Sequence, residues 1–180
     1  MASRWIVTAL GKDRPGIVAG VTKILYQLGC NLEDSAMTRL AGEFAIMLIF
    51  SIPARLNADR LRRSFAPLER RGLAVHLKPL TASETRAPRA KGQAFQISVY
   101  GADRPGIVFR ISEALAKLGA NITDVHAHRS AGGGPSLYML LLEVEVPPRR
   151  SQQALQAQLT RIAQQLKVDV SLRAAEAPVL

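Results

Sequence analysis

Residues 11–18 read Gly-Lys-Asp-Arg-Pro-Gly-Ile-Val, and residues 101–108 read Gly-Ala-Asp-Arg-Pro-Gly-Ile-Val. The match continues without a gap, because residues 28–34 (Leu-Gly-Cys-Asn-Leu-Glu-Asp) correspond to residues 118–124 (Leu-Gly-Ala-Asn-Ile-Thr-Asp). Half of the positions from 11 to 34 are identical to their partners 90 positions later. A repeat of this length is too long for a solenoid unit, so it indicates two copies of one small domain.

The length and composition fit such a duplication. The 180 residues suffice for two domains of about 80 to 90 residues each, and a hydrophobic content of 48% predicts a globular chain. No apolar run reaches the roughly 18 residues of a membrane span, and residues 1–6 lack the apolar core of a signal peptide. The single cysteine, Cys30, excludes an intrachain disulfide. We therefore expect a cytoplasmic protein that does not contact membranes.

The net charge of +10 is compatible with an acidic or nucleic-acid partner. The basic residues, however, are spread over a predicted helix, the segment between the two copies and a turn. They are Arg60, Arg62, Arg63, Arg70, Arg71, Arg86, Arg89, Lys91, Arg149 and Arg150. This distribution favours a solvated surface, and an electrostatic surface for a partner is the alternative interpretation.

Hydrophobic periodicity predicts the same order of elements, strand-helix-strand-strand-helix-strand, in both copies. In the first copy the strands are expected at 5–10, 35–40, 44–50 and 73–77, and the helices at 15–28 and 57–71. In the second copy the strands are expected at 95–100, 125–129, 137–146 and 168–172, and the helices at 105–118 and 151–166. Pro15 suits the first turn of its helix, whereas Pro67 is unfavourable inside a helix.

Two helices on one face of a four-stranded antiparallel sheet form the ferredoxin-like arrangement. The predicted fold class is therefore α+β, with two βαββαβ domains in tandem. We place the domains at residues 1–80 and 94–174, with a linker at 81–93, a hairpin tip at 131–135 and a tail at 175–180. The free edges and faces of the sheets need covering, which pairing of domains or a homodimer could provide.

The repeated segments lie at the two ends of the first predicted helix of each copy. Asp13 and Asp103 place a carboxylate just before that helix, where it either caps free N–H groups or contacts a ligand. Asn31 and Asn121 follow the helix, where they either adopt a left-handed turn conformation or offer hydrogen bonds to a ligand. Gly16 (and Gly106 in the second copy) permits close approach of the backbone.

A small zwitterion needs N–H groups for its carboxylate and oxygen acceptors for its ammonium group. The turn and the asparagine can supply both, but a helix of about 14 residues separates them by about 20 Å. One domain alone therefore cannot easily bring both to one ligand. A second, facing copy could do so, and this predicts a ligand held between copies.

These motifs resemble the ACT domain, a regulatory amino-acid-binding module, twice and over nearly the whole chain. Residues 9–18 and 29–35, followed by Gly42-Glu43-Phe44, more narrowly resemble the tandem-ACT glycine cleavage system transcriptional repressor family. The resemblance implies that the turn before the helix binds the effector and that the asparagine segment of a facing domain completes the site. The implied ligand-binding residues are Asp13, Arg14, Pro15, Gly16, Ile17, Asn31, Leu32, Asp103, Arg104, Pro105, Gly106, Ile107, Asn121 and Ile122.

Other kinds of site find little support in the sequence. His126 and His128 alternate on a predicted strand without a third metal ligand, so we interpret them as surface or interface residues. Cys30 has no histidine at a recognisable catalytic spacing. The glycines at 132–134 lack the Lys-Ser/Thr of a phosphate loop. We therefore predict no enzymatic activity, no metal and no cofactor.

The resemblance implies a regulator that binds a small, glycine-like amino acid between its ACT copies and changes its hold on a partner protein. For the named family that partner is a transcription activator. The alternatives are a ligand-free scaffold for protein interaction, a direct nucleic-acid binder and an enzyme of unrecognised activity. Nucleic acid is the weaker interpretation, because residues 44–50 and 137–144 lack the Lys/Arg-Gly-Phe/Tyr pattern of RNA-recognition sheets.

Overall fold

The computed structural model describes residues 3–81, 92–130 and 136–175. The chain divides into two compact units, residues 1–87 and 88–180, each with its own sheet and its own hydrophobic core. Most of the predicted linker and tail, and all of the predicted hairpin tip at 131–135, lie outside the described residues. Within the described residues, no helix has the length and apolar character needed to cross a bilayer.

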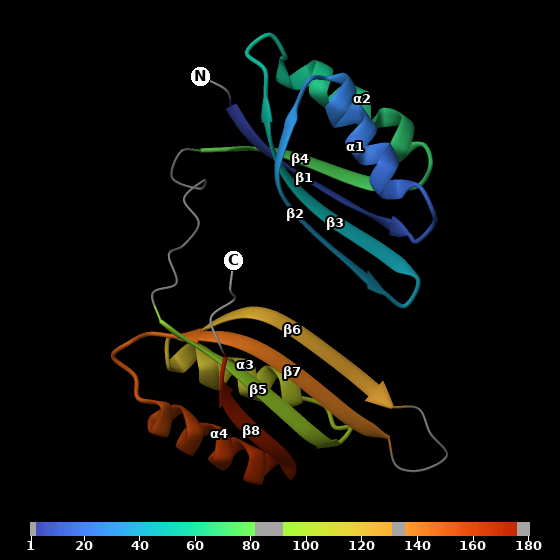
Figure 1. Ribbon diagram of the computed structural model, residues 1–180. Coiled ribbons are helices and arrows are strands. Elements are labelled where there is room, and N and C mark those ends of the chain that lie inside the picture. The colour runs from blue at the N-terminus through green and yellow to red at the C-terminus, as the bar shows by residue number, and fades with distance from the viewer. Residues whose placement is uncertain (1–2, 82–91, 131–135, 176–180) are drawn as a thin grey trace. The chain divides into compact units, whose positions relative to one another are not determined.

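The first unit has the predicted order of elements. They are β1 (Ser3–Lys12), α1 (Ile17–Gln27), β2 (Asn31–Leu40), β3 (Glu43–Ile52), α2 (Ala58–Glu69) and β4 (Ala74–Leu80). The strands form an antiparallel sheet in the order β2-β3-β1-β4, and α1 and α2 lie together on one of its faces (Figure 1). This topology leaves β2 and β4 as the two edge strands.

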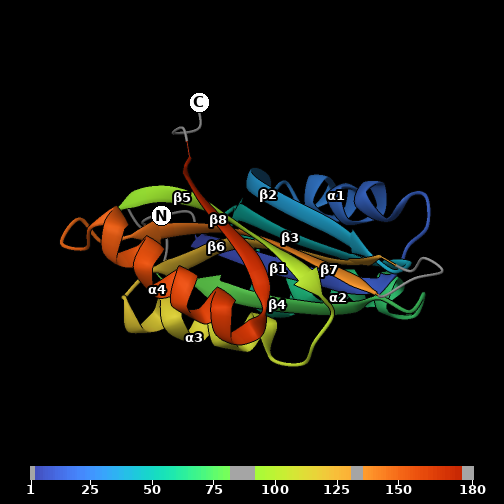
Figure 2. The ribbon, with the colours of Figure 1, turned by 90° about the horizontal axis from the view of Figure 1, so that it is seen from below.

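The second unit repeats this architecture. Its elements are β5 (Gln93–Ala102), α3 (Ile107–Lys117), β6 (Asn121–Ser130), β7 (Leu137–Val146), α4 (Gln152–Leu166) and β8 (Val168–Ala174). The antiparallel strand order is β6-β7-β5-β8, and α3 lies beside α4 on one face of the sheet (Figure 2). The predicted α+β fold with two ferredoxin-like βαββαβ units is confirmed.

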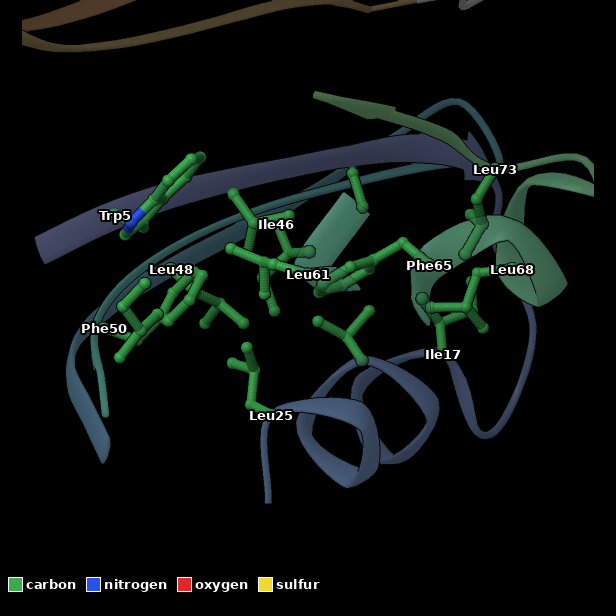
Figure 3. Close-up of a cluster of buried hydrophobic side chains, with 14 of the residues drawn as sticks. Trp5, Ile17, Leu25, Ile46, Leu48, Phe50, Leu61, Phe65, Leu68 and Leu73 are labelled. Carbon is green, nitrogen blue, oxygen red and sulfur yellow. The ribbon is translucent and has the colours of Figure 1, made fainter. Parts of the chain in front are cut away.

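Each core lies between the sheet and its helix pair. In the first unit, alternate residues of β1 and β3 meet the apolar stripes of α1 and α2 (Figure 3). The most deeply buried side chains there include Val7, Val21, Phe50 and Leu61, each 0% exposed. The indole nitrogen of Trp5 is buried without a hydrogen-bond partner among the described residues, and the Arg62 guanidinium lies 5.9 Å from the Trp5 ring centroid.

Strands β2 and β6 begin earlier than predicted, at Asn31 and Asn121. Both are edge strands whose residues are almost all exposed, so they carry no hydrophobic alternation that would mark them in the sequence. Each also contains a register shift, between Leu32 and Asp34 and at the equivalent positions of β6. A bulge of this kind inverts the side-chain alternation and hides the period of two.

The repeated aspartate after each asparagine has a structural role at this bulge. The Asp34 carboxylate accepts a hydrogen bond of 2.7 Å from the N–H of Ser35. The Asp124 carboxylate accepts one of 2.9 Å from the N–H of Val125. Because a bulge leaves a residue out of the regular ladder, such a local acceptor stabilises the distorted backbone.

The first helix of each unit starts and ends in the same way. Gly16 is the N-cap of α1 with φ near 90°. Pro15 therefore lies in the turn before the helix, and its predicted place in the first helical turn is wrong. At the other end, the N–H of Cys30 donates to Leu25 O and that of Gly29 to Tyr26 O, which is a Schellman motif. Pro67 lies inside α2, two residues before its last residue, Glu69, so the helix includes a residue that the sequence marked as unfavourable there.

Candidate functional site

The turn between β1 and α1 is held in place by the neighbouring hairpin. The N–H of Asp13 donates to the carbonyl of Gly42 at 2.9 Å, and in the second unit the N–H of Asp103 donates to Ser136 O at 2.9 Å. Gly16 then takes a left-handed conformation that an L side chain rarely adopts. The result is a fixed turn that presents its backbone at the start of the helix.

The first turn of α1 has free backbone donors. Its N-cap residue, Gly16, offers no side-chain hydrogen bond, and the first turn carries no acidic side chain. The first hydrogen bond of the helix runs from the N–H of Gly20 to Gly16 O at 2.8 Å. The N–H groups before it, those of Ile17, Val18 and Ala19, have no partner in the helix and carry the positive end of its dipole. The same description applies to α3.

Asp13 and Asp103 do not cap these helices, so that interpretation of the two residues is wrong. Asp13 Oδ2 lies 3.2 Å from Arg39 Nη1, and Asp103 Oδ2 lies 3.6 Å from Arg129 Nη1. Both arginines come from the edge strands β2 and β6, on the face of the sheet that carries the helices. Each carboxylate is therefore held at the side of the turn by a cation.

A groove lies beside this turn in the first unit. It is open to solvent and has a volume of about 720 Å³. Its walls are the turn, the first half of α1 and the end of β2. The lining residues are Asp13, Arg14, Pro15, Gly16, Ile17, Val18, Ala19, Thr22, Met37, Arg39 and Phe44. The groove thus combines one carboxylate, two guanidinium groups, free N–H donors and an apolar wall.

Arg14 links the turn to the second helix of its unit. Its Nη2 donates a hydrogen bond of 2.8 Å to the carbonyl of Arg71, just beyond the C-terminus of α2. Arg104 occupies the equivalent position in the second unit. No hydrogen bond of its side chain is found within the part of the chain that the structure describes, so the two copies differ here.

The asparagines lie at the opposite end of α1 and α3 from the turns, as the sequence predicted. Asn31 and Asn121 are the first residues of β2 and β6. They do not have the left-handed backbone that the alternative interpretation required, because the only described non-glycine residues with positive φ are Ala41 and Lys167. Both amides are exposed, and neither has a hydrogen-bond partner among the described residues.

The remaining predicted site residues divide by burial. Ile17 and Ile107 are buried at 4% and 2% exposure, so their side chains belong to the cores and only their backbone faces the turn. Pro105 and Gly106 form the turn of the second unit. Leu32 is exposed on the bulge of β2, whereas Ile122 packs partly against the second core. No single unit brings the turn and the asparagine together.

Sequence reasoning missed Arg39 and Arg129. A signal was present, because the two arginines occupy equivalent positions of the repeat, 90 residues apart. The match between the copies is interrupted before it, because residues 35–38 all differ from residues 125–128. Thr22 and Met37 were also missed, and their equivalents in the second copy, Ser112 and Ala127, are different residues.

In the part of the chain that the structure describes, other polar groups form no comparable site. His126 Nε2 lies 2.9 Å from Asp124 Oδ2 on an exposed strand. Among the described residues, no three histidine, cysteine or acidic side chains gather in a way that could hold a metal ion. Burial raises the pKa of the Cys30 thiol, which lowers its reactivity at neutral pH.

Comparison with known proteins agrees with this architecture. The family model of the ACT domain matches residues 3–76 and again residues 93–173. The glycine cleavage system transcriptional repressor of Escherichia coli is 34% identical over 122 residues, which span 67% of this chain and 62% of that protein. A protein of unknown function from Galdieria sulphuraria has a solved structure that matches 98% of this chain and 100% of its own, at 25% identity and a TM-score of 0.81.

A second relative matches a shorter segment of this chain. The UPF0237 protein MK1213 of Methanopyrus kandleri is 41% identical over 61 residues, which span 33% of this chain and 68% of that protein. Because the family model matches two separate segments that coincide with the two sheets, the match and the fold describe the same duplication. The chain therefore belongs to the ACT domain family and carries two copies of that domain.

Proposed function

We propose that this protein is a regulator that binds a small, glycine-like amino acid at the turn before α1 or α3 and thereby changes its hold on a partner transcription regulator. The observation that carries the proposal is the repeated combination of a fixed turn, free helix N–H groups and a carboxylate–arginine pair. The name of the Escherichia coli relative, a glycine cleavage system transcriptional repressor, supports the choice of glycine and of a transcriptional partner.

The chemistry of the groove is complementary to a zwitterion. The free N–H groups at the start of α1 and the Arg39 guanidinium suit a carboxylate. The Asp13 carboxylate suits an ammonium group. In this proposal the unpaired amide of Asn31 or Asn121 from a facing ACT copy completes the site, because no single unit supplies it.

A thermal-shift screen against the twenty amino acids tests the ligand. A ligand present at 100 times its dissociation constant adds about 2.7 kcal/mol to stability, which is roughly 5 to 10 °C for a chain of this size. We expect glycine or a similarly small amino acid to raise the melting temperature. The shift should disappear in the double variant Asp13→Ala, Asp103→Ala and in the double variant Asn31→Ala, Asn121→Ala.

The matched control is Asp59→Ala with Asp169→Ala, which removes one exposed carboxylate from each unit without changing a residue of either turn. This variant should respond to the amino acid as the natural chain does. An equal loss in the control would mean that net charge, and not the turn, governs the response. No shift with any amino acid would favour the second candidate, a ligand-free ACT scaffold for protein interaction, which the exposed edge strands β2 and β6 make reasonable.

A further inference from the structure

The second helices of the two units share one buried face. After the N-caps Asn57 and Ser151, whose side chains accept hydrogen bonds from Arg60 N–H and Ala154 N–H, α2 and α4 align residue by residue. The aligned buried pairs are Leu61 and Leu155, Phe65 and Leu159, and Leu68 and Ile162. The two helices therefore pack on their sheets through the same pattern of apolar positions.

Their solvent faces differ in charge. Five arginines lie on or just after α2, and the residues aligned with them in α4 are alanine or glutamine. The pairs are Arg60 and Ala154, Arg62 and Gln156, Arg63 and Ala157, Arg70 and Gln164, and Arg71 and Gln165. All five arginines are exposed. Since α4 packs equally well without them, the fold does not require these charges.

The arginines of this basic α2 face (Arg60, Arg62, Arg63, Arg70 and Arg71) are mostly free of internal partners. Arg62 lies 3.8 Å from Asp59 and also over the Trp5 ring. For the other four guanidinium groups, the described residues provide no ion-pair partner. Exposed arginines close together on one helix repel each other and lower its stability. An external anionic partner would offset this repulsion in the first unit.

We infer that the basic α2 face docks an acidic segment of the partner protein. The inference rests on the proposed binding of a partner protein, and it assigns that partner a place on the chain. A helix of 12 residues extends about 18 Å, which suits an acidic helix or strand of similar length. Arginine, unlike lysine, holds a carboxylate with two parallel hydrogen bonds, so five of them recognise Asp and Glu side chains with directional specificity.

A protein segment fits this face better than nucleic acid does. Asp59 and Glu69 lie on the same helix, one near each end, and would repel any anionic group opposite them. A phosphate backbone carries a charge at every nucleotide, whereas a protein segment can place uncharged residues opposite Asp59 and Glu69. The one aromatic residue of α2, Phe65, is buried at 1% exposure and cannot stack on a base. Mixed charges of this kind are typical of a surface that recognises a patterned partner.

The link from Arg14 to Arg71 O joins this face to the candidate ligand turn. A hydrogen bond of 2.8 Å connects the turn that borders the groove with the residue that ends the basic α2 face. A ligand that repositions Arg14 would therefore act directly on the end of the docking surface. Binding at the turn and docking at α2 would then influence each other reciprocally.

Fluorescence anisotropy with two labelled probes tests the inference on the full, amino-acid-free chain. One probe is a 20-residue peptide rich in Asp and Glu, and the other is a 20-base-pair DNA duplex. The test variant replaces each α2 arginine by its α4 counterpart: R60A, R62Q, R63A, R70Q and R71Q. The control variant removes five exposed arginines from the second unit: R110Q, R149Q, R150Q, R161Q and R173Q. The two variants have the same net charge.

The natural chain should bind the peptide, the α2 variant should bind it at least about tenfold more weakly, and the control should lose less than about threefold. Absent peptide binding, equal loss in both variants, or no loss in the α2 variant would overturn the inference. If the duplex bound more tightly than the peptide and lost this binding with the α2 arginines, the partner of this face would be nucleic acid and not an acidic protein segment. Because no amino acid is present, these outcomes are independent of the thermal-shift screen.

Discussion

Asp13 Oδ2 lies 3.2 Å from Arg39 Nη1, so an arginine of the edge strand holds the carboxylate that precedes α1. The same relationship joins Asp103 and Arg129 at 3.6 Å. Both arginine side chains are about two-thirds exposed, which limits the energy of the pairs through solvent screening. The pairs therefore matter more for positioning the carboxylate than for holding the fold together.

A double-mutant cycle on Asp13→Ala and Arg39→Gln should give a coupling energy of only about 0.2–1 kcal/mol in urea denaturation. The cycle on Asp103 and Arg129 should give less, because the distance is longer. Raising the salt concentration should shrink both values. A coupling of several kcal/mol that persists in high salt would contradict the exposed geometry.

Gly16→Ala should destabilise the first unit by about 1–2 kcal/mol, because φ near 90° is a left-handed conformation that alanine tolerates poorly. A methyl group there would meet no atom within 4 Å, so backbone strain alone sets the cost. Gly16→Asn should cost less, since asparagine visits this region more readily. Equal stability of the natural chain and the two variants in urea titration would rule out the left-handed turn.

Leu61→Ala and Leu155→Ala should each cost about 2–5 kcal/mol, since both side chains are fully buried at equivalent positions. Trp5 is the only tryptophan of the chain and lies in the first core. The denaturation midpoint measured by Trp5 fluorescence should therefore fall markedly in the Leu61→Ala variant. Leu155→Ala should show its full effect by circular dichroism, and a Trp5 midpoint that falls equally in both variants would show that the two units unfold as one.

Arg14→Lys should cost about 0.5–1.5 kcal/mol, because lysine keeps the charge but cannot reproduce the guanidinium bond to Arg71 O. Arg104→Lys is the matched change in the second unit and should cost less than half as much. Amide exchange at the C-terminal end of α2 should also accelerate in Arg14→Lys. Equal effects of the two substitutions on stability would show that the bond to Arg71 has no energetic weight.

Cys30 should react more slowly with a thiol reagent than free cysteine does at pH 8. Burial raises the pKa of its thiol, and the thiolate is the reactive form. The rate should therefore rise with pH, and the rise should be centred at a higher pH than for free cysteine. In denaturant the difference should vanish, and a rate at pH 8 that already equals that of free cysteine in the folded chain would contradict the burial.

The fold was readable from the sequence where burial imposes a period. Residues such as Phe44, Ile46 and Leu48 alternate because one face of β3 is buried, and Ile17, Val21 and Leu25 recur because α1 packs on that face. The edge strands were only partly readable. All residues of β2 are exposed, and the bulge at Glu33 shifts its register. The start of this strand therefore shows no alternation of apolar and polar residues.

The candidate site could be predicted from the sequence only where the two copies match closely, at residues 11–34 and 101–124. Asp13 and Asn31 were identified because each recurs 90 residues later, and the structure places them at the turn and at the start of β2. The partner of Asp13 was not identified although Arg39 recurs as Arg129, because the four residues before each arginine differ between the copies and the contact depends on the register of β2 with β3. Such long-range contacts are set by tertiary packing and not by local pattern.

The unlike outer faces of α2 and α4 have a consequence for stoichiometry. A faithful duplicate would carry two equal docking helices and would bind two partner molecules or a two-fold symmetric one. This chain carries a basic helix in one copy and a glutamine-rich helix in the other, so only its first unit offers the docking face. An acidic partner that recognises α2 would therefore bind with one molecule per chain, whatever the symmetry of the two cores.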